Sequence, residues 1–94
     1  MTETSVRRDE ERCRYELVED GVVVGHAAFR GLNGVVVMPH TEIDPRRRGT
    51  GLGAKLVQGA LDDLRQRGSK VVPSCWYVAE FIDGHPDYAD LLAD

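Results

Sequence analysis

Apolar and polar positions alternate through the first part of the chain. Between residues 12 and 17 every second side chain is apolar and those between are charged, which is the two-residue period of a half-buried strand. Asp-Gly at 20–21 is a hairpin-turn dipeptide, and the apolar run 22–29 predicts a second strand. Residues 1–11 are polar and charged with little to bury, so we expect a flexible N-terminus there.

A third strand is predicted at residues 35–43, after the turn-forming segment Gly-Leu-Asn-Gly at 31–34. The opening half is therefore an antiparallel meander. Pro39 interrupts the third strand and cannot donate a ladder hydrogen bond. It marks either a simple edge strand or a bulge at which the third strand separates from the strand on its far side.

A helical period takes over in residues 51–67, where apolar side chains recur at every third or fourth position, and Gly68 ends the run. Residues 70–74 form a short apolar strand that must be parallel to the third one, with a right-handed crossover, because a helix joins them. Residues 77–82 are compatible with a helix, and Pro86 starts a short C-terminal helix. The predicted fold is α+β: an antiparallel β-meander followed by a βαβ crossover, in the order β-β-β-α-β-α.

The length of 94 residues predicts one domain, residues 12–94, that buries a core without metal or disulfide. The net charge of −4 argues against a general nucleic-acid binder. Because the sequence shows no signal peptide and no transmembrane stretch, we expect a cytoplasmic protein with no membrane partner. We expect a monomer or weak homodimer in which Cys13 and Cys75 are free thiols.

Arginines and glycines concentrate just before the helix. The segment reads Arg46, Arg47, Arg48, Gly49, Thr50, Gly51, Leu52 and Gly53. A strand that leads through a glycine loop into a helix forms an anion site, because the first-turn N–H groups are unpaired and the helix dipole favours negative charge. We expect the ligand to be a pyrophosphate, which glycines allow to approach the backbone closely. The arginines either pair with phosphate oxygens or form a solvated charge run.

Three motifs compete for this loop. A Walker loop needs Lys-Ser/Thr directly after its last glycine, where this chain continues Ala-Lys-Leu. A dinucleotide fingerprint needs G-x-G-x-x-G and an acidic residue about 20 positions on, whereas this chain has G-x-G-x-G and Pro73 near that distance. The third pattern, Arg48-x-x-Gly51-x-Gly53, resembles the (Q/R)-x-x-G-x-(G/A) signature of the GNAT acetyltransferase superfamily, in which the loop holds the pyrophosphate of acetyl-coenzyme A.

The flanking segments sharpen this resemblance. His-Thr-Glu-Ile occupies 40–43, Val-Val-Pro-Ser-Cys occupies 71–75, and His-Pro-Asp-Tyr occupies 85–88. With the loop, they resemble the small single-domain GNAT-like N-acetyltransferases of the Acetyltransf_CG group, which has NATD-type members, over residues 12–91. The resemblance implies a minimal GNAT-like fold.

The resemblance also implies a ligand and its contacts. Acetyl-coenzyme A would be the co-substrate, bound through residues 46–53, with Ile43 and Tyr77 in the coenzyme-binding set. Packing on the sheet is the alternative for Tyr77. In GNAT folds the thioester lies in an opening between two central strands, which a break at Pro39 would provide.

Acetyl transfer to an amine requires a group that takes a proton from the nitrogen. A free lysine amine, with a pKa of about 10.4, is almost entirely protonated at pH 7, and freeing its lone pair costs roughly 4.6 kcal/mol. His40 and Glu42 lie two positions apart on the predicted third strand and therefore on one face, so they are candidates to take that proton directly or through a water. The alternative is a structural histidine and a solvated or helix-capping carboxylate.

Cys75 ends the strand after the helix, at the carboxyl edge where open α/β sheets place ligands. The resemblance makes it the signature cysteine of the group, near the acetyl group. It either accepts the acetyl group in a covalent intermediate or lies beside a directly transferred one. We expect Cys13 in the core and His26 in a structural role. No Cys/His cluster has metal-ligand spacing in the sequence, so we predict no metal.

These features predict an acetyl-coenzyme A-dependent N-acetyltransferase whose acceptor is an amine of a protein lysine, an N-terminus or a small molecule. The predicted order lacks the N-terminal helical pair and the closing strands of larger GNAT enzymes. That difference motivates a rival class, a non-catalytic module that binds coenzyme A or an acyl-coenzyme A and acts through a protein partner. An arginine-loop interaction with nucleic acid is disfavoured by the acidic total, and we expect none.

Overall fold

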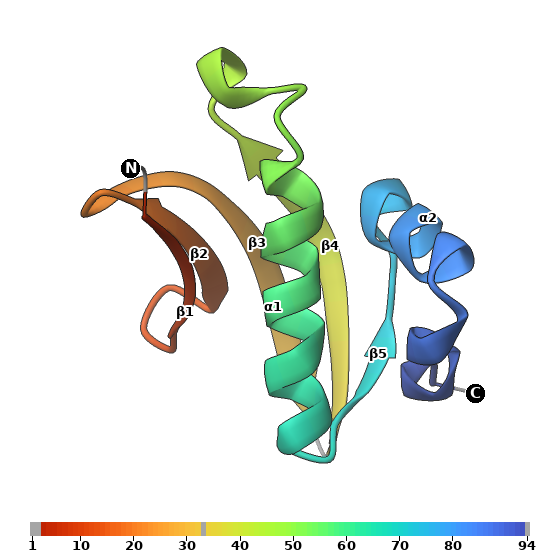
Figure 1. The fold of residues 1–94 in the computed structure, drawn as a ribbon. Coiled ribbons are helices and arrows are strands. Elements are labelled where there is room, and N and C mark those ends of the chain that lie inside the picture. The colour runs from red at the N-terminus through yellow and green to blue at the C-terminus, as the bar shows by residue number, and fades with distance from the viewer. Residues whose placement is uncertain (1–2, 33, 94) are drawn as a thin grey trace.

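A computed structural model describes residues 3–32 and 34–93, and its architecture is one mixed sheet covered by helices (Figure 1). The elements are β1 Thr4–Asp9, β2 Arg14–Glu19, β3 Val22–Leu32, β4 Val35–Ile43, the 3₁₀ helix η1 Pro45–Arg47, α1 Leu52–Gln66, β5 Lys70–Val72, α2 Trp76–Gly84 and the 3₁₀ helix η2 Pro86–Leu91. The strand order in the sheet is β1-β2-β3-β4-β5. The first four strands are antiparallel, and β5 is parallel to β4. The α+β fold and the βαβ crossover are therefore confirmed, with one strand more than predicted.

The additional strand is β1, and the prediction of a flexible segment at residues 1–11 is wrong for its described part. Thr4 to Asp9 pair with β2 along their whole length. Residues 1–2 lie outside the described part of the chain. The sequence did not indicate this strand, because the partner of its charged Arg7 lies on β2: Arg7 Nε donates to Glu16 Oε1 over 2.8 Å. Its packing depends on Val6, which lies against the core.

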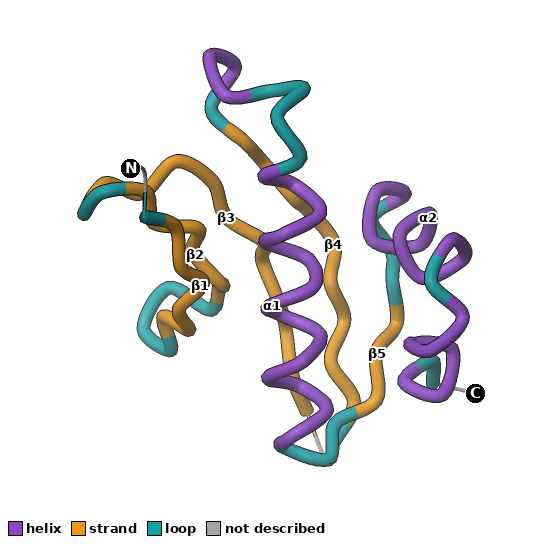
Figure 2. Tube along the Cα trace, in the orientation of Figure 1, coloured by secondary structure: helices purple, strands orange, loops and turns teal. Residues whose placement is uncertain are grey.

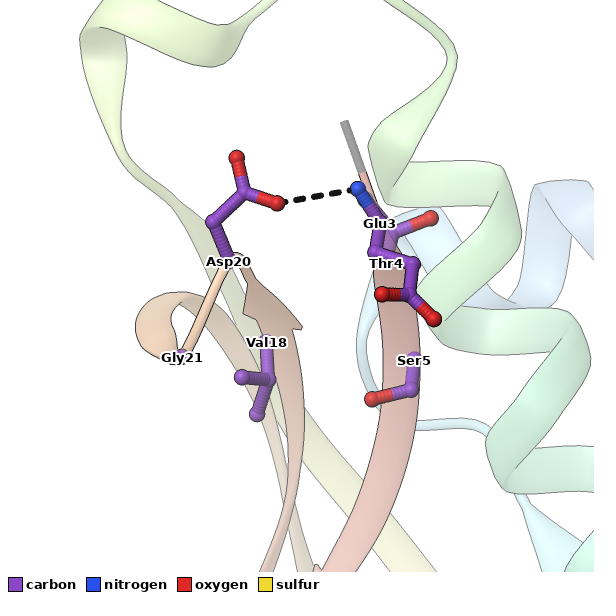
Figure 3. Close-up of a pocket in the computed structure, with 6 residues that line it drawn as sticks. All are labelled: Glu3, Thr4, Ser5, Val18, Asp20 and Gly21. Carbon is purple, nitrogen blue, oxygen red and sulfur yellow. Dashed lines mark hydrogen bonds between the residues drawn. The ribbon is translucent and has the colours of Figure 1, made fainter. Parts of the chain in front are cut away.

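The beginning of β1 is held to the β2–β3 hairpin by two reciprocal hydrogen bonds. The backbone N–H of Glu3 donates to Asp20 Oδ1 over 3.0 Å (Figure 3), and the N–H of Asp20 donates to the Glu3 carbonyl over 3.0 Å. Asp20 adopts a φ of 50°, a left-handed conformation that aspartate tolerates in turns better than most residues do. The turn at 20–21 predicted from Asp-Gly is thus also the anchor of the N-terminal strand.

One face of the sheet is covered by α1, which crosses in front of β3 and β4 (Figure 2). The predicted apolar stripe is buried there. Its members are Leu56, Val57, Ala60, Leu61 and Leu64. They pack in one core with sheet residues such as Tyr15, Leu17, Ala27 and Met38. Cys13 is not among them: it is exposed in the β1–β2 turn, with a φ of 52°, so its predicted core position is wrong.

Pro39 lies in a β-bulge between β3 and β4, just beyond the last residue of β4 that pairs with β5. In the β3–β4 register, Arg30 faces Val37 and Ala28 faces His40, so Met38 and Pro39 together oppose the single residue between Ala28 and Arg30. On its other side, β4 pairs with β5 only at residues 35–37. β5 ends at this point, and the backbone N–H of Cys75 donates to the Met38 carbonyl over 2.9 Å at the base of the opening that follows. Of the two sequence hypotheses for Pro39, the separation is confirmed.

Gly59 lets β1 pack on α1, and replacing it should reverse the usual effect of a glycine-to-alanine change in a helix. A Cβ at Gly59 would lie 2.7 Å from the Cβ of Val6. Overpacking costs about 1–3 kcal/mol, whereas alanine normally gains about 1 kcal/mol over glycine in a helix. Because the two effects oppose each other, we expect Gly59→Ala to lower the free energy of unfolding in urea by up to about 2 kcal/mol.

Gly84→Ala is the matched control for this prediction. Gly84 is also helical, and a Cβ there has no neighbour within 4 Å among the described atoms. This variant should be neutral or more stable by up to about 1 kcal/mol. If Gly59→Ala were as stable as Gly84→Ala, the packing of β1 on α1 would be refuted.

Candidate active site

The loop between β4 and α1 is shaped by a short 3₁₀ turn and two left-handed glycines. Asp44 begins the turn, since its carboxylate accepts from the backbone N–H of Arg46 over 3.0 Å. Gly49 and Gly51 both adopt a φ of 81°, which side-chain-bearing residues rarely adopt. A Cβ at either glycine would have no neighbour within 4 Å among the described atoms. The glycines therefore serve the backbone conformation and leave the surface of the loop open.

The N-terminus of α1 opens at the end of this loop. Gly51 is its N-cap residue, and no side chain caps the helix by a hydrogen bond in the described structure. The N–H groups of its first turn thus lack both an intrahelical acceptor and a side-chain cap, and they favour an anion. Gly53 allows close packing of Tyr77 on this turn, because a Cβ at Gly53 would lie 2.5 Å from the tyrosine hydroxyl oxygen.

The three arginines of the loop have different surroundings. Arg46 is bound to Asp44, with Nη2 3.2 Å from Oδ2, and does not line the cleft described below. Arg47 lines the cleft and is held by Glu19, with Nε 2.6 Å from Oε1. Arg48 also lines the cleft, and within residues 3–32 and 34–93 no ion pair is found for it. Arg48 is therefore the side chain best placed to meet a phosphate, with Arg47 beside it.

A cleft of about 740 Å³ joins the loop to the opening between β4 and β5. It is lined by Pro39, His40, Thr41, Glu42, Ile43, Arg47, Arg48, Gly49, Gly51, Gly53, Ser74, Cys75, Trp76 and Tyr77. The hollow in Figure 3, about 320 Å³, shares no lining residue with it. The sequence-predicted residues are thus largely brought together. The exceptions are Arg46, Thr50 and Leu52, which are not part of the lining.

Thr50 and Leu52 support the loop from within. The Thr50 hydroxyl donates to the Arg47 carbonyl over 2.6 Å, and Leu52 packs against the core. Both side chains thus stabilise the conformation of the loop.

Cys75 is buried at the base of the opening, where it is the N-cap residue of α2. Its Sγ lies 3.6 Å from Thr41 Oγ1. Burial raises the pKa of the Cys75 thiol, but the Thr41 hydroxyl and the N–H groups of Val78 and Tyr77 stabilise the thiolate more, so the pKa lies below its ordinary value. These N–H groups belong to the first turn of α2, which no side chain caps by a hydrogen bond in the described structure. They therefore lower the pKa of the thiol as the N-terminal end of a nearby helix does.

His40 and Glu42 project from β4 on the side opposite to Thr41, as the strand period requires. His40 Nε2 and Glu42 Oε2 are 3.5 Å apart, and both side chains are 60% exposed. Because the same cleft touches Cys75 and these two residues, it passes through the opening from one face of the sheet to the other. A group bound beside Cys75 can therefore be approached from the His40 and Glu42 face.

The sequence reasoning missed one residue of this face. His26 stands directly opposite Glu42 in the β3–β4 register, and its Nε2 is 3.7 Å from Glu42 Oε2. Burial lowers the pKa of His26, as does the nearby Arg14, against the opposing effect of Glu42. Only the pairing of two predicted strands, whose register was not assigned from sequence, could have revealed this neighbour.

The family is decided by a comparison with protein-family models. The model described as GCN5-related N-acetyl-transferase, Acetyltransf_CG, matches residues 14–91. The chain belongs to this GNAT family. The predicted resemblance is confirmed over nearly the length on which it was based. No curated protein sequence matches the chain significantly.

Solved structures of GNAT proteins share the fold. A GCN5-like protein from Staphylococcus aureus is 18% identical, with a TM-score of 0.71 over 95% of this chain and 87% of its own. The ribosomal-protein-S18-alanine N-acetyltransferase from Escherichia coli is 20% identical, with a TM-score of 0.65 over 82% of this chain and 53% of its own. A GNAT family acetyltransferase from Brucella melitensis, solved in complex with acetyl-CoA, is 28% identical, with a TM-score of 0.57 over 72% of this chain and 50% of its own.

These matches differ in how much of the other protein they include. The chain spans about half the length of the Escherichia coli and Brucella melitensis enzymes, but most of the Staphylococcus aureus protein.

Among the helices that the structure describes, none has the length and apolar character needed to cross a bilayer.

Proposed function

We propose that this GNAT protein transfers an acetyl group from acetyl-coenzyme A to an amine. The observation that carries the proposal is the single cleft that joins the uncapped N-terminus of α1, the side chains of Arg47 and Arg48, the thiol of Cys75 and the carboxylate of Glu42. The first two features suit a pyrophosphate. The Brucella melitensis relative was solved with acetyl-CoA, which supports the same ligand here.

The loop residues present fit the coenzyme. The left-handed glycines leave open space above the backbone, and Arg48 has no competing ion pair among the described residues. With the pyrophosphate at α1, the pantetheine arm would follow Ile43 and Tyr77 along the cleft. The thioester would then lie in the opening between β4 and β5, beside Cys75.

In the proposed reaction the amine nitrogen attacks the thioester carbonyl, the carbon–sulfur bond breaks, and coenzyme A leaves as a thiolate. Glu42 accepts the proton released from the nitrogen, directly or through a water, with His40 3.5 Å away as its neighbour. The acceptor is the amine of a protein lysine, of an N-terminus or of a small molecule. Its approach is along the exposed face of β4.

Cys75 has two possible roles in this scheme. In direct transfer it lies beside the acetyl group without bonding to it. In a covalent route its sulfur would take the acetyl group from coenzyme A and pass it to the amine. Its burial and its contact with Thr41 are compatible with both, and we favour direct transfer because a buried cysteine ordinarily packs as a small apolar residue.

Calorimetric titration of acetyl-coenzyme A and dephospho-coenzyme A, followed by a turnover assay, tests the function. We expect micromolar-range binding that weakens without the 3′-phosphate, and steady, amine-dependent release of coenzyme A. Release should be followed by chromatography, because exposed Cys13 would consume a thiol reagent. Binding without turnover on any class of amine would favour the rival function, a coenzyme-binding module. No binding of either coenzyme would refute both.

A further inference from the structure

We propose that His26, His40 and Glu42 bind a zinc ion on the sheet face opposite α1. The three residues are brought together by strand pairing. His26 faces Glu42 across β3 and β4, and His40 precedes Glu42 by two residues, so its side chain lies on the same face. All three side chains belong to the paired strands β3 and β4. The sheet itself therefore holds the three ligands close to one another, and no loop is needed to position them.

The distances between the ligand atoms suit a small tetrahedral ion. His26 Nε2 is 3.7 Å and His40 Nε2 is 3.5 Å from Glu42 Oε2, and the three ligand atoms all lie within 4.8 Å of one another. Zinc bonds of about 2.0–2.1 Å at tetrahedral angles place ligand atoms roughly 3.3–3.4 Å apart. The carboxylate oxygen of Glu42 therefore already lies close to the required distance from each imidazole nitrogen. A rotation of the exposed His40 ring would bring the two imidazole nitrogens to the same separation.

The donor types favour zinc over the common hard cations. Two imidazole nitrogens and one carboxylate oxygen are ligands that zinc accepts, and three protein ligands leave a fourth position for water. Magnesium and calcium take oxygen ligands in larger numbers, and this set offers only the carboxylate of Glu42. The prediction of no metal was based on ligands that are close along the chain. His26 and Glu42, in contrast, come together only through the pairing of β3 and β4.

The charges around the three residues are already paired. Glu16 lies next to His26 in the β2–β3 register, but its carboxylate is held by Arg7 over 2.8 Å and by Arg14 over 2.8 Å. Glu16 is thus occupied and does not complete the site, and the nearby Arg14 charge is offset by its own partner. The ion would be held by the two histidines and Glu42 alone.

The consequence of this site rests on the proposed function. Zinc would occupy Glu42 and His40, the groups placed to accept the amine proton, while leaving the coenzyme loop free. We therefore expect zinc to inhibit acetyl transfer reversibly, in competition with the amine and without effect on the affinity for acetyl-coenzyme A. His26 separates the two roles, because it belongs to the proposed metal site and not to the proposed catalytic machinery.

The direct test is calorimetric titration of Zn²⁺ into the wild-type chain and into His26→Asn, with Co²⁺ absorption as a report on tetrahedral geometry. We expect one ion per chain in the wild type. Loss of a group that only hydrogen-bonds to a metal ligand costs about 10–100-fold in metal affinity, so loss of the His26 ligand itself should weaken binding at least about tenfold. The controls His85→Asn and Cys13→Ser remove an exposed histidine and an exposed thiol elsewhere, and they should bind zinc as the wild type does.

The outcomes of this test are distinct. Absence of zinc binding, or equal binding by the wild type and His26→Asn, would overturn the proposal. In the turnover assay, His26→Asn should keep its activity in zinc-free buffer and lose at least about tenfold of its sensitivity to zinc. If the wild type bound zinc through His26 but showed no turnover with any amine, the metal site would stand and the proposed function would fail.

Discussion

Replacing Glu42 with glutamine is expected to lower the turnover number about 100- to 10,000-fold, the range that a positioned general base contributes. Glutamine keeps the size of the side chain and its exposed position on β4, but it cannot take up the proton of the attacking amine. Because the change lies away from the loop at residues 46–53, the affinity for acetyl-coenzyme A should stay within about twofold. Steady-state kinetics and coenzyme titration measure the two quantities separately.

Glu80→Gln is the control for this variant. Glu80 is an exposed carboxylate on α2 and is not part of the lining of the cleft, so its neutralisation should leave turnover unchanged. If Glu42→Gln transferred acetyl groups as fast as Glu80→Gln, Glu42 would not be the proton acceptor. Full activity in Glu42→Gln together with loss of activity in His40→Asn would move that role to the histidine.

Gly51→Val should weaken the binding of acetyl-coenzyme A by about 5- to 30-fold. Gly51 has a φ of 81° as the N-cap residue of α1, and a side-chain-bearing residue pays about 1–2 kcal/mol there. A branched residue relieves this strain by moving the loop, which turns the first-turn N–H groups away from the pyrophosphate. Since each 1.4 kcal/mol changes an affinity tenfold, titration of acetyl-coenzyme A detects the loss.

Gly68→Val imposes a similar strain at the other end of the same helix. Gly68 has a φ of 72°, and a Cβ there has no neighbour within 4 Å among the described atoms. Both variants should lose comparable stability in thermal unfolding, but only Gly51→Val should lose affinity for the coenzyme. Equal affinities in the two variants would show that the loop does not bind the pyrophosphate.

Local patterns in the sequence determined the elements that are buried on one face and the glycine loop for which we propose coenzyme binding. The stripe on α1 was predictable because a helix buries side chains that lie three and four positions apart. The loop was predictable because left-handed turns require residues such as Gly49 and Gly51. The family signature added the order of the segments, which the match at residues 14–91 confirmed.

Several outcomes depended on contacts between residues distant in sequence. β1 was not predicted because it is stabilised by pairing with β2 and by the packing of Val6 against Gly59 of α1. No local pattern in the sequence shows these contacts. Cys13 occupies an apolar position of an alternating pattern, but the β1–β2 turn extends through it and β2 begins only at Arg14. A strand boundary is set by where pairing stops, which is a property of both strands.

The charged groups illustrate the same division. The sequence placed three arginines beside a glycine loop, and only the tertiary structure decided that Asp44 holds Arg46, that Glu19 holds Arg47, and that Arg48 faces the cleft. The period of the strand put His40 and Glu42 on one face, but the register between β3 and β4 added His26. Sequence periodicity thus determined the face on which a side chain lies, while strand register and helix packing decided its neighbours. The physical reason is that hydrogen bonds and ion pairs depend on the distance between two groups in space, whatever their separation along the chain.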